Sequence, residues 1–179
     1  MARLRAFIPL LVFVALGLLL WRGLSLDPNH MPSALEGRPL PVFRAQTLDG
    51  REVTDANLRG RPALLNVWAT WCPTCAAEHA YLNQLAARGI VVHGLVYKDD
   101  PEKARRWIAE KGNPYDVLIL DESGRIGIDL GVTGAPETYV LDAEGIIRLR
   151  HQGAVDERVW QSKIAPALGL APDKPGEGS

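Results

Sequence analysis

Two cysteines, separated by two residues, lie where a predicted strand meets a predicted helix. The tetrapeptide Cys-Pro-Thr-Cys at residues 72–75 follows the apolar residues 63–71 and precedes the helical pattern of residues 76–87. At the start of a helix, the first thiol meets unpaired backbone N–H groups and the positive end of the helix dipole. Both effects favour the thiolate, which is the form that attacks disulfides. The position therefore predicts a redox-active pair.

Other uses of a Cys pair fit this sequence less well. The chain has 2 cysteines, and a bridge between them closes a loop too small to stabilise a fold by much. A structural zinc site needs four ligands, and although His79 could face the same side of the helix as Cys75, no obvious fourth ligand follows. Covalent haem attachment requires His directly after the second Cys, where Ala76 stands. Dithiol–disulfide exchange is favoured, with no metal and no cofactor.

Length and charge indicate one folded domain with additional segments at its N- and C-terminal ends. A chain of 179 residues suits a single α/β core with a buried sheet. The formal net charge is −1 and both signs are scattered, so a nucleic-acid surface is not expected. Residues 171–179, rich in Pro, Gly and charge, are expected to form a disordered tail.

The N-terminal residues are predicted to form a membrane anchor. Arg3 and Arg5 precede an uninterrupted apolar stretch, and the segment that could span the membrane is residues 6–26. A cleaved signal peptide is the alternative, but no A-x-A pattern stands just after the apolar run. Arginines at the extreme N-terminus place residues 1–5 in the cytoplasm, so the rest of the chain is expected outside.

Behind the anchor, residues 27–38 read as a linker and residues 39–170 as the folded domain. Strands alternate with helices along this domain and end in a hairpin, which predicts an α/β fold with a mixed sheet flanked by helices. The expected elements are an N-terminal hairpin (42–48 and 52–54), strands at 63–69, 90–97 and 117–120, helices from Cys72 and from Asp100, a turn at 121–124, a second hairpin (137–141 and 145–150) and a final helix at 156–168.

Several segments resemble one protein family. Residues 68–75, with the sequence WATWCPTC, resemble the active-site segment of thioredoxin-like proteins. Residues 131–139, GVTGAPETY, resemble the cis-proline segment of the cytochrome c maturation branch, the DsbE or CcmG family. Residues 75–79 and 97–100 are similar to that family too, and the likeness runs over most of residues 39–168.

The resemblance implies a thioredoxin-like fold with an inserted strand–helix unit, preceded by one transmembrane helix. It implies that the chain reduces the haem-binding Cys pair of apocytochrome c on the periplasmic side of the bacterial inner membrane. Electrons would come from a membrane thiol reductase of the DsbD or CcdA type, and other cytochrome c maturation proteins are further candidate partners. Two alternatives stay open: a module that binds or holds apocytochrome, and a broad periplasmic oxidant or isomerase.

Within the motif, each residue has an expected role. Cys72 is expected to be the exposed attacking thiolate, and Cys75, one turn into the helix, the resolving thiol. Pro73 fixes φ in the first turn, and Thr74 offers a small polar contact. Trp71 is expected to pack beside the site, with direct contact to the substrate as the alternative.

Further residues are expected near the Cys pair or to take part in its proton transfer. The Ala135–Pro136 bond is predicted to be cis. Asn66 stands where thioredoxins carry a buried Asp, and an amide cannot accept a proton as a base. That role is expected to pass to Glu78, to Glu137 or to water. Both carboxylates would oppose formation of the thiolate and favour basic or polar peptides.

Overall fold

The computed structural model describes residues 8–24 and 35–170, in two units that comprise residues 1–31 and 32–179. The first unit contains helix α2 (Ile8–Leu24), which has 17 residues. Within residues 8–24 and 35–170, no helix combines the length and apolar character needed to cross a membrane. The anchor therefore stays a prediction, and the predicted cytoplasmic residues 1–5, most of the linker and the tail lie outside the described residues.

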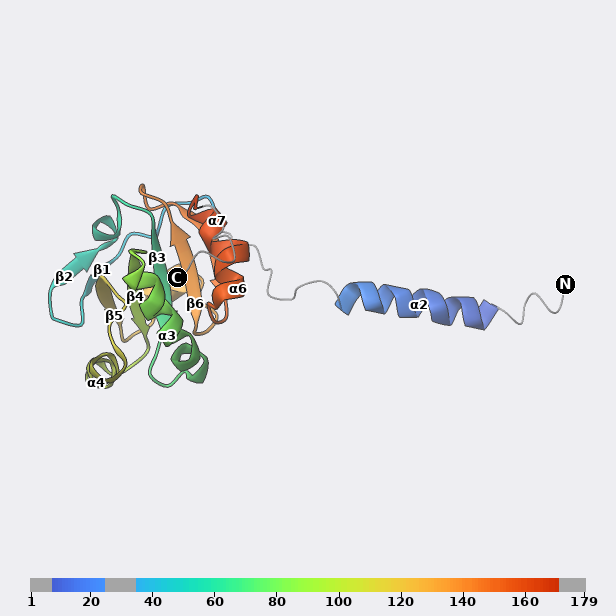
Figure 1. Cartoon of the computed structure of the whole chain (residues 1–179), viewed down its shortest axis with the longest axis horizontal. Coiled ribbons are helices and arrows are strands. Elements are labelled where there is room, and N and C mark those ends of the chain that lie inside the picture. Colours follow the sequence, from blue (N-terminus) through green and yellow to red (C-terminus); the bar gives the residue numbers. More distant parts are fainter. Residues whose placement is uncertain (1–7, 25–34, 171–179) are drawn as a thin grey trace, which may run out of the picture. The chain divides into compact units, whose positions relative to one another are not determined.

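The second unit is built on a five-stranded mixed sheet with the strand order β5-β4-β3-β6-β7 (Figure 1). The strands are β3 (Ala63–Trp68), β4 (Val92–Tyr97), β5 (Val117–Asp121), β6 (Glu137–Leu141) and β7 (Ile147–Gln152). Strands β3, β4 and β5 run parallel, whereas β6 is antiparallel to β3 and to β7. The expected mixed sheet is therefore confirmed. Between β4 and β6 the chain forms a helix, the edge strand β5 and a second, short helix.

Strand β3 is buried on both faces because its side chains alternate between two hydrophobic clusters. Leu64 and Trp68 pack in the cluster that contains the Cys pair, whereas Leu65 and Val67 pack in the opposite one. All six residues of β3 are buried, as expected of a central parallel strand.

The helices begin and end where their capping residues predict. Helix α3 (Pro73–Ala87) starts directly after Cys72, and α4 (Pro101–Lys111) starts after Asp100, whose carboxylate accepts the Lys103 N–H at 2.9 Å. Gly112, with φ at 89°, ends α4. The expected final helix is present as three joined pieces: α6 (Glu157–Val159), a π-helical turn (Trp160–Ile164) and α7 (Ala165–Ala167).

The N-terminal hairpin is shorter than predicted. It consists of β1 (Arg44–Gln46) and β2 (Glu52–Thr54), paired antiparallel. Its first strand ends early because the chain turns to the edge of the main sheet, where the Leu48 N–H donates to the Leu118 carbonyl at 2.8 Å. Thr47 forms an isolated bridge with Ile119 beside it.

Two short helices were not predicted. A 3₁₀ helix (Asp55–Leu58) follows β2, and α5 (Arg125–Asp129) follows the turn after β5. Helix α5 depends on a contact that a local pattern does not indicate: the buried carboxylate of Asp121 accepts the N–H groups of Ile126 and Gly127.

The other edge of the sheet is covered by the first described residues of this unit. Gly37 N–H donates to the Ile147 carbonyl at 2.8 Å, and Ile147 N–H donates to the Arg38 carbonyl at 2.9 Å. Pro39 forms a bridge with Ile146. Residues 37–40 therefore run along the start of β7.

Candidate active site

The Cys pair lies at the first turn of α3, directly after the carboxyl end of β3. Cys72 and Cys75 are joined by a disulfide. Cys72 is the N-cap of α3, and its sulfur accepts the Cys75 N–H at 3.0 Å. A sulfur that receives a helix N–H is better able to carry negative charge, so the geometry favours a Cys72 thiolate in the reduced protein.

The expectation of an exposed Cys72 is wrong for this oxidised state. Cys72 is 3% exposed and Cys75 is 2% exposed. Pro73 and Thr74, which lie between them, are exposed. The disulfide is thus covered, and the exposed surface of the motif is the Pro-Thr dipeptide.

The loop before Cys72 is held by the loop that follows β4. The Asp99 carboxylate accepts the Thr70 backbone N–H, and it also accepts the Thr70 hydroxyl at 3.0 Å. The Trp71 indole N–H donates to the Lys98 carbonyl at 3.1 Å, although Trp71 is 54% exposed. The ring of Trp71 therefore lies at the surface beside the Cys pair, and its role in packing or in substrate contact stays a prediction.

The role of Lys98 and Asp99 was missed from the sequence, although a signal was present. Both residues follow β4, and the carboxyl ends of parallel strands meet at one edge of a sheet.

A pocket lies beside the Cys pair, next to the cis-proline. The Ala135–Pro136 bond is cis, as predicted. The pocket has a volume of about 300 Å³ and is bordered on one side by Thr74 of the Cys motif. Its other walls come from the loop before β6 and the end of β7: Thr133, Gly134, Ala135, Pro136, Glu137, Gln152 and Gly153. A peptide that occupies this pocket would therefore lie against the exposed Pro-Thr dipeptide.

A buried polar network lies behind the Cys pair, centred on Asn66. The Asn66 amide donates to the Glu78 carboxylate at 3.0 Å and to the Thr138 hydroxyl at 3.1 Å. Its carbonyl oxygen accepts the Tyr115 hydroxyl at 3.1 Å. The second oxygen of Glu78 accepts the Val155 N–H at 2.8 Å. The network joins β3, α3, β6 and two loops.

Tyr115 reaches this network because β4 provides space for its ring. A Cβ atom at Gly94 would lie 2.9 Å from the Tyr115 ring and 2.8 Å from Leu118, so no other residue fits at position 94 without displacement. The Tyr115 ring stacks on Trp68, with centroids 5.6 Å apart. The role of Tyr115 could not be inferred from local sequence.

Glu78 is buried on the same face of α3 as Cys75, one turn further along the helix. It is 2% exposed, which excludes a solvated position. Burial raises the pKa of Glu78 to about 7, and hydrogen bonds from Val155 and Asn66 partly offset this rise. Glu78 can therefore exchange a proton near neutral pH.

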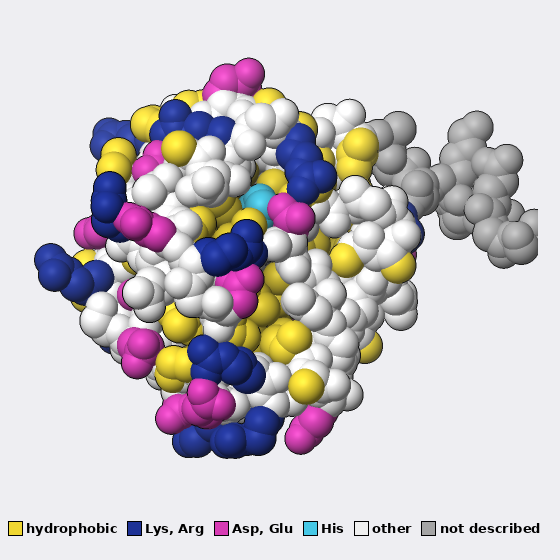
Figure 2. Space-filling view, turned by 90° about the vertical axis from the view of Figure 1, so that its left-hand side faces the viewer, with side chains coloured by type: hydrophobic (Ala, Val, Ile, Leu, Met, Phe, Trp, Pro, Cys, Tyr) yellow, Lys and Arg dark blue, Asp and Glu magenta, His cyan; other side chains and the backbone are white. Residues whose placement is uncertain are grey.

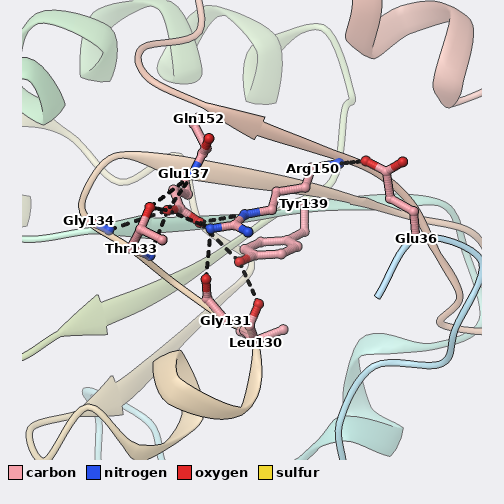
Figure 3. Close-up of polar contacts among 9 residues, drawn as sticks. All are labelled: Glu36, Leu130, Gly131, Thr133, Gly134, Glu137, Tyr139, Arg150 and Gln152. Carbon is pink, nitrogen blue, oxygen red and sulfur yellow. Dashed lines mark hydrogen bonds and ion pairs between the residues drawn. The ribbon is translucent and has the colours of Figure 1, made fainter. Parts of the chain in front are cut away.

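Glu137 lies on the pocket wall but is not the free surface carboxylate that was expected. It is 1% exposed and forms an ion pair with Arg150 of β7, at 2.8 Å (Figure 3). Neither Glu137 nor Glu78 therefore forms an acidic surface that would select basic peptides. This expectation is wrong because Arg150 pairs with Glu137 across the β6–β7 hairpin, a contact that no local pattern indicates.

A second cavity lies on the face formed by the β1–β2 turn, α4 and the start of β5. Its volume is about 360 Å³, and Leu48, Ile108, Tyr115 and Leu118 are among its lining residues. Figure 2 shows apolar side chains gathered in a hollow on this face, with charged side chains of both signs around it. Cys72 and Cys75 do not line it.

Comparison with known proteins identifies close relatives of the chain. Residues 35–168 match the family model described as Redoxin. The "Thiol:disulfide interchange protein DsbE" of Escherichia coli strain K12 is 50% identical over 174 residues, which cover 93% of this chain and 94% of the relative. The protein of the same name from Pseudomonas aeruginosa is 46% identical over 177 residues, which cover 98% of both chains.

A solved structure shows the same fold. The crystal structure of a "putative Thiol:disulfide interchange protein DsbE from Chlorobium tepidum" aligns with a TM-score of 0.66 and 24% identity, and the alignment covers 75% of this chain and 98% of that one.

The raised pKa of Glu78 should make the stability of the oxidised protein depend on pH. The unfolded chain loses the Glu78 proton near pH 4.5, whereas the folded protein keeps it to about pH 7. The contribution of protonated Glu78 to the free energy of unfolding is therefore fully present below pH 4.5. It is lost as the pH rises through 7, by about 3 kcal/mol in total. Urea unfolding should show this as a difference between the two proteins. The free energy of unfolding of Glu78→Gln, relative to that of wild type, should be about 3 kcal/mol higher at pH 8 than at pH 4.5.

The matched control is Glu110→Gln, which changes an exposed carboxylate of α4. It should follow the wild-type pH dependence. If Glu78→Gln also followed the wild-type curve, the carboxyl group of Glu78 would titrate at its ordinary pKa.

Proposed function

This chain belongs to the DsbE family of thiol:disulfide interchange proteins and is a thiol:disulfide oxidoreductase, and on that premise we propose that it reduces the haem-binding disulfide of apocytochrome c. The observation that carries the proposal is the Cys72–Cys75 disulfide at a helix N-terminus, beside a pocket next to the cis-proline. Such a pocket can receive the segment of an extended peptide that flanks a Cys-x-x-Cys-His disulfide.

The reaction proceeds by two exchange steps. The Cys72 thiolate attacks one sulfur of the substrate disulfide and forms a mixed disulfide, and the other substrate sulfur leaves as a thiolate and takes up a proton. Cys75 then loses its proton and attacks the Cys72 sulfur, which releases the second substrate thiol. Two electrons pass to the substrate, and the protein is left in the disulfide form described above.

Glu78 is the proposed acceptor of the Cys75 proton. Asn66 occupies the place of the thioredoxin Asp and donates to Glu78. The titratable group of this chain therefore lies on α3, whereas that of thioredoxins lies on the central strand. A carboxylate with a pKa of about 7 is matched to proton transfer near neutral pH.

In the Glu78→Gln variant, the rate of substrate release from the mixed disulfide should fall by about 100-fold or more at pH 7. The defect should shrink at pH 9, because a thiol with a pKa of about 8.5 ionises there without a base. Quenched-flow measurement of the mixed disulfide at both pH values tests this, and an equal loss at both would argue against a proton acceptor.

The proposal includes a source of electrons. An oxidised Cys pair can act as a reductant again only after another dithiol reduces it, and the proposed donor is a membrane thiol reductase of the DsbD or CcdA type. Other cytochrome c maturation proteins are further proposed partners in the inner membrane.

We further propose that residues 6–26 anchor the chain in the inner membrane, with the thioredoxin-like domain in the periplasm. Helix α2 is apolar along Ile8–Leu24 except for Arg22, and a snorkelling Arg22 would extend the usable length. Alkali extraction should leave the full-length chain with the membranes. Its release into the soluble fraction, or a mature N-terminus beyond Leu26, would contradict the anchor.

The roles of the two cysteines can be separated by substitution. Cys72→Ser should abolish disulfide reduction, because it removes the attacking sulfur. Cys75→Ser should instead trap a mixed disulfide with the substrate, which non-reducing electrophoresis and mass spectrometry would detect. Trapping by Cys72→Ser but not by Cys75→Ser would show that the roles are reversed.

Redox state in cells distinguishes the proposal from its alternatives. Alkylation of free thiols should show a reduced Cys pair when the reductase is intact, and c-type cytochromes should fail to form without the protein. A fully oxidised pair in such cells would indicate an oxidant or isomerase. Cytochrome formation rescued by a double Cys72→Ser, Cys75→Ser variant would indicate a binding or holding module.

A further inference from the structure

We propose that Arg150 is a positioning residue for the substrate: with Glu137, it holds the loop of residues 131–134 that forms one wall of the pocket beside the Cys pair. This inference rests on the proposed function, since it concerns how an oxidised peptide is received.

Arg150 and Glu137 form a buried, two-point ion pair across β6 and β7. Arg150 Nε donates to Glu137 Oε2, and Arg150 Nη2 donates to Glu137 Oε1, both at 2.9 Å. The side chains are 8% and 2% exposed. Loss of either partner would leave an uncompensated buried charge, so each residue fixes the position of the other.

The same pair is bonded to the loop that precedes the cis-proline (Figure 3). Glu137 Oε1 accepts the Thr133 N–H at 2.9 Å, the Thr133 hydroxyl at 2.8 Å and the Gly134 N–H at 3.3 Å. Arg150 Nη2 donates to the Gly131 carbonyl at 2.7 Å. The loop conformation therefore depends on a guanidinium and a carboxylate that themselves face the protein interior.

This loop shapes the pocket without contributing to the Cys chemistry. Thr133 and Gly134 line the pocket together with Thr74, and the Gln152 amide, which also lines it, donates to the Thr133 hydroxyl at 2.8 Å. The Cys72 sulfur, in contrast, receives its hydrogen bond from α3. A change at Arg150 should therefore alter peptide binding more than thiol reactivity.

The test compares two disulfides reduced by the full-length protein. For Arg150→Met, the second-order rate constant for a synthetic peptide with an oxidised Cys-x-x-Cys-His sequence should fall about 10-fold, and that for hydroxyethyl disulfide less than about 2-fold. The reduction potential of the Cys pair should stay unchanged. Amide hydrogen exchange should accelerate at Thr133 and Gly134.

The matched control is Arg148→Met. Arg148 lies two residues earlier on the same face of β7, but it is 53% exposed and pairs with Asp142 in the hairpin turn. This variant should keep both rate constants and the exchange rates of the loop.

Arg150→Lys provides a second variant if Arg150→Met does not fold. Lysine keeps the charge but lacks the two-point fork, so the peptide rate should again fall more than the rate for the small disulfide. Equal losses on both substrates, or no change on either, would overturn the positioning role. A wild-type protein that reduces hydroxyethyl disulfide but not the peptide would instead contradict the proposed function.

Discussion

The arrangement around the Cys pair depends on one buried amide, that of Asn66 in the middle of the central strand. Its two N–H groups and its carbonyl oxygen are all hydrogen-bonded, to Glu78, Thr138 and Tyr115. An unpaired amide here would cost about 1–3 kcal/mol, so three elements are held at fixed distances from β3. Helix α3 is one of them, and its orientation places Cys72 near the carboxyl end of β3.

The features that follow local rules could be predicted from the sequence. Strand β3 was recognisable as an apolar run because both of its faces are covered, and α4 was delimited by Asp100 and Gly112. The position of the Cys pair at a helix N-terminus and the cis bond before Pro136 were predicted for the same reason: short motifs carry them.

The features that depend on distant partners could not be predicted. The sequence predicts that Glu137 lies near the cis-proline, but its charge is neutralised by Arg150, which reaches it across a hairpin. Glu78 is held by Val155, 77 residues later, and no helical pattern indicates that contact. The Trp71 indole donates to the Lys98 carbonyl, 27 residues away in sequence, and no local pattern indicates that contact.

Both edges of the five-stranded sheet are covered over part of their length, and this matters for a protein whose proposed substrate is an unfolded chain. Residues 37–40 run along the start of β7, and the Leu48 N–H donates to the Leu118 carbonyl of β5 at the opposite edge. An unfolded polypeptide offers free backbone groups that pair readily with an open strand. Where these residues occupy the two edges, such a chain cannot add as an extra strand. Pairing of an unfolded chain with the sheet edge, which can lead to aggregation, is thereby disfavoured at these positions.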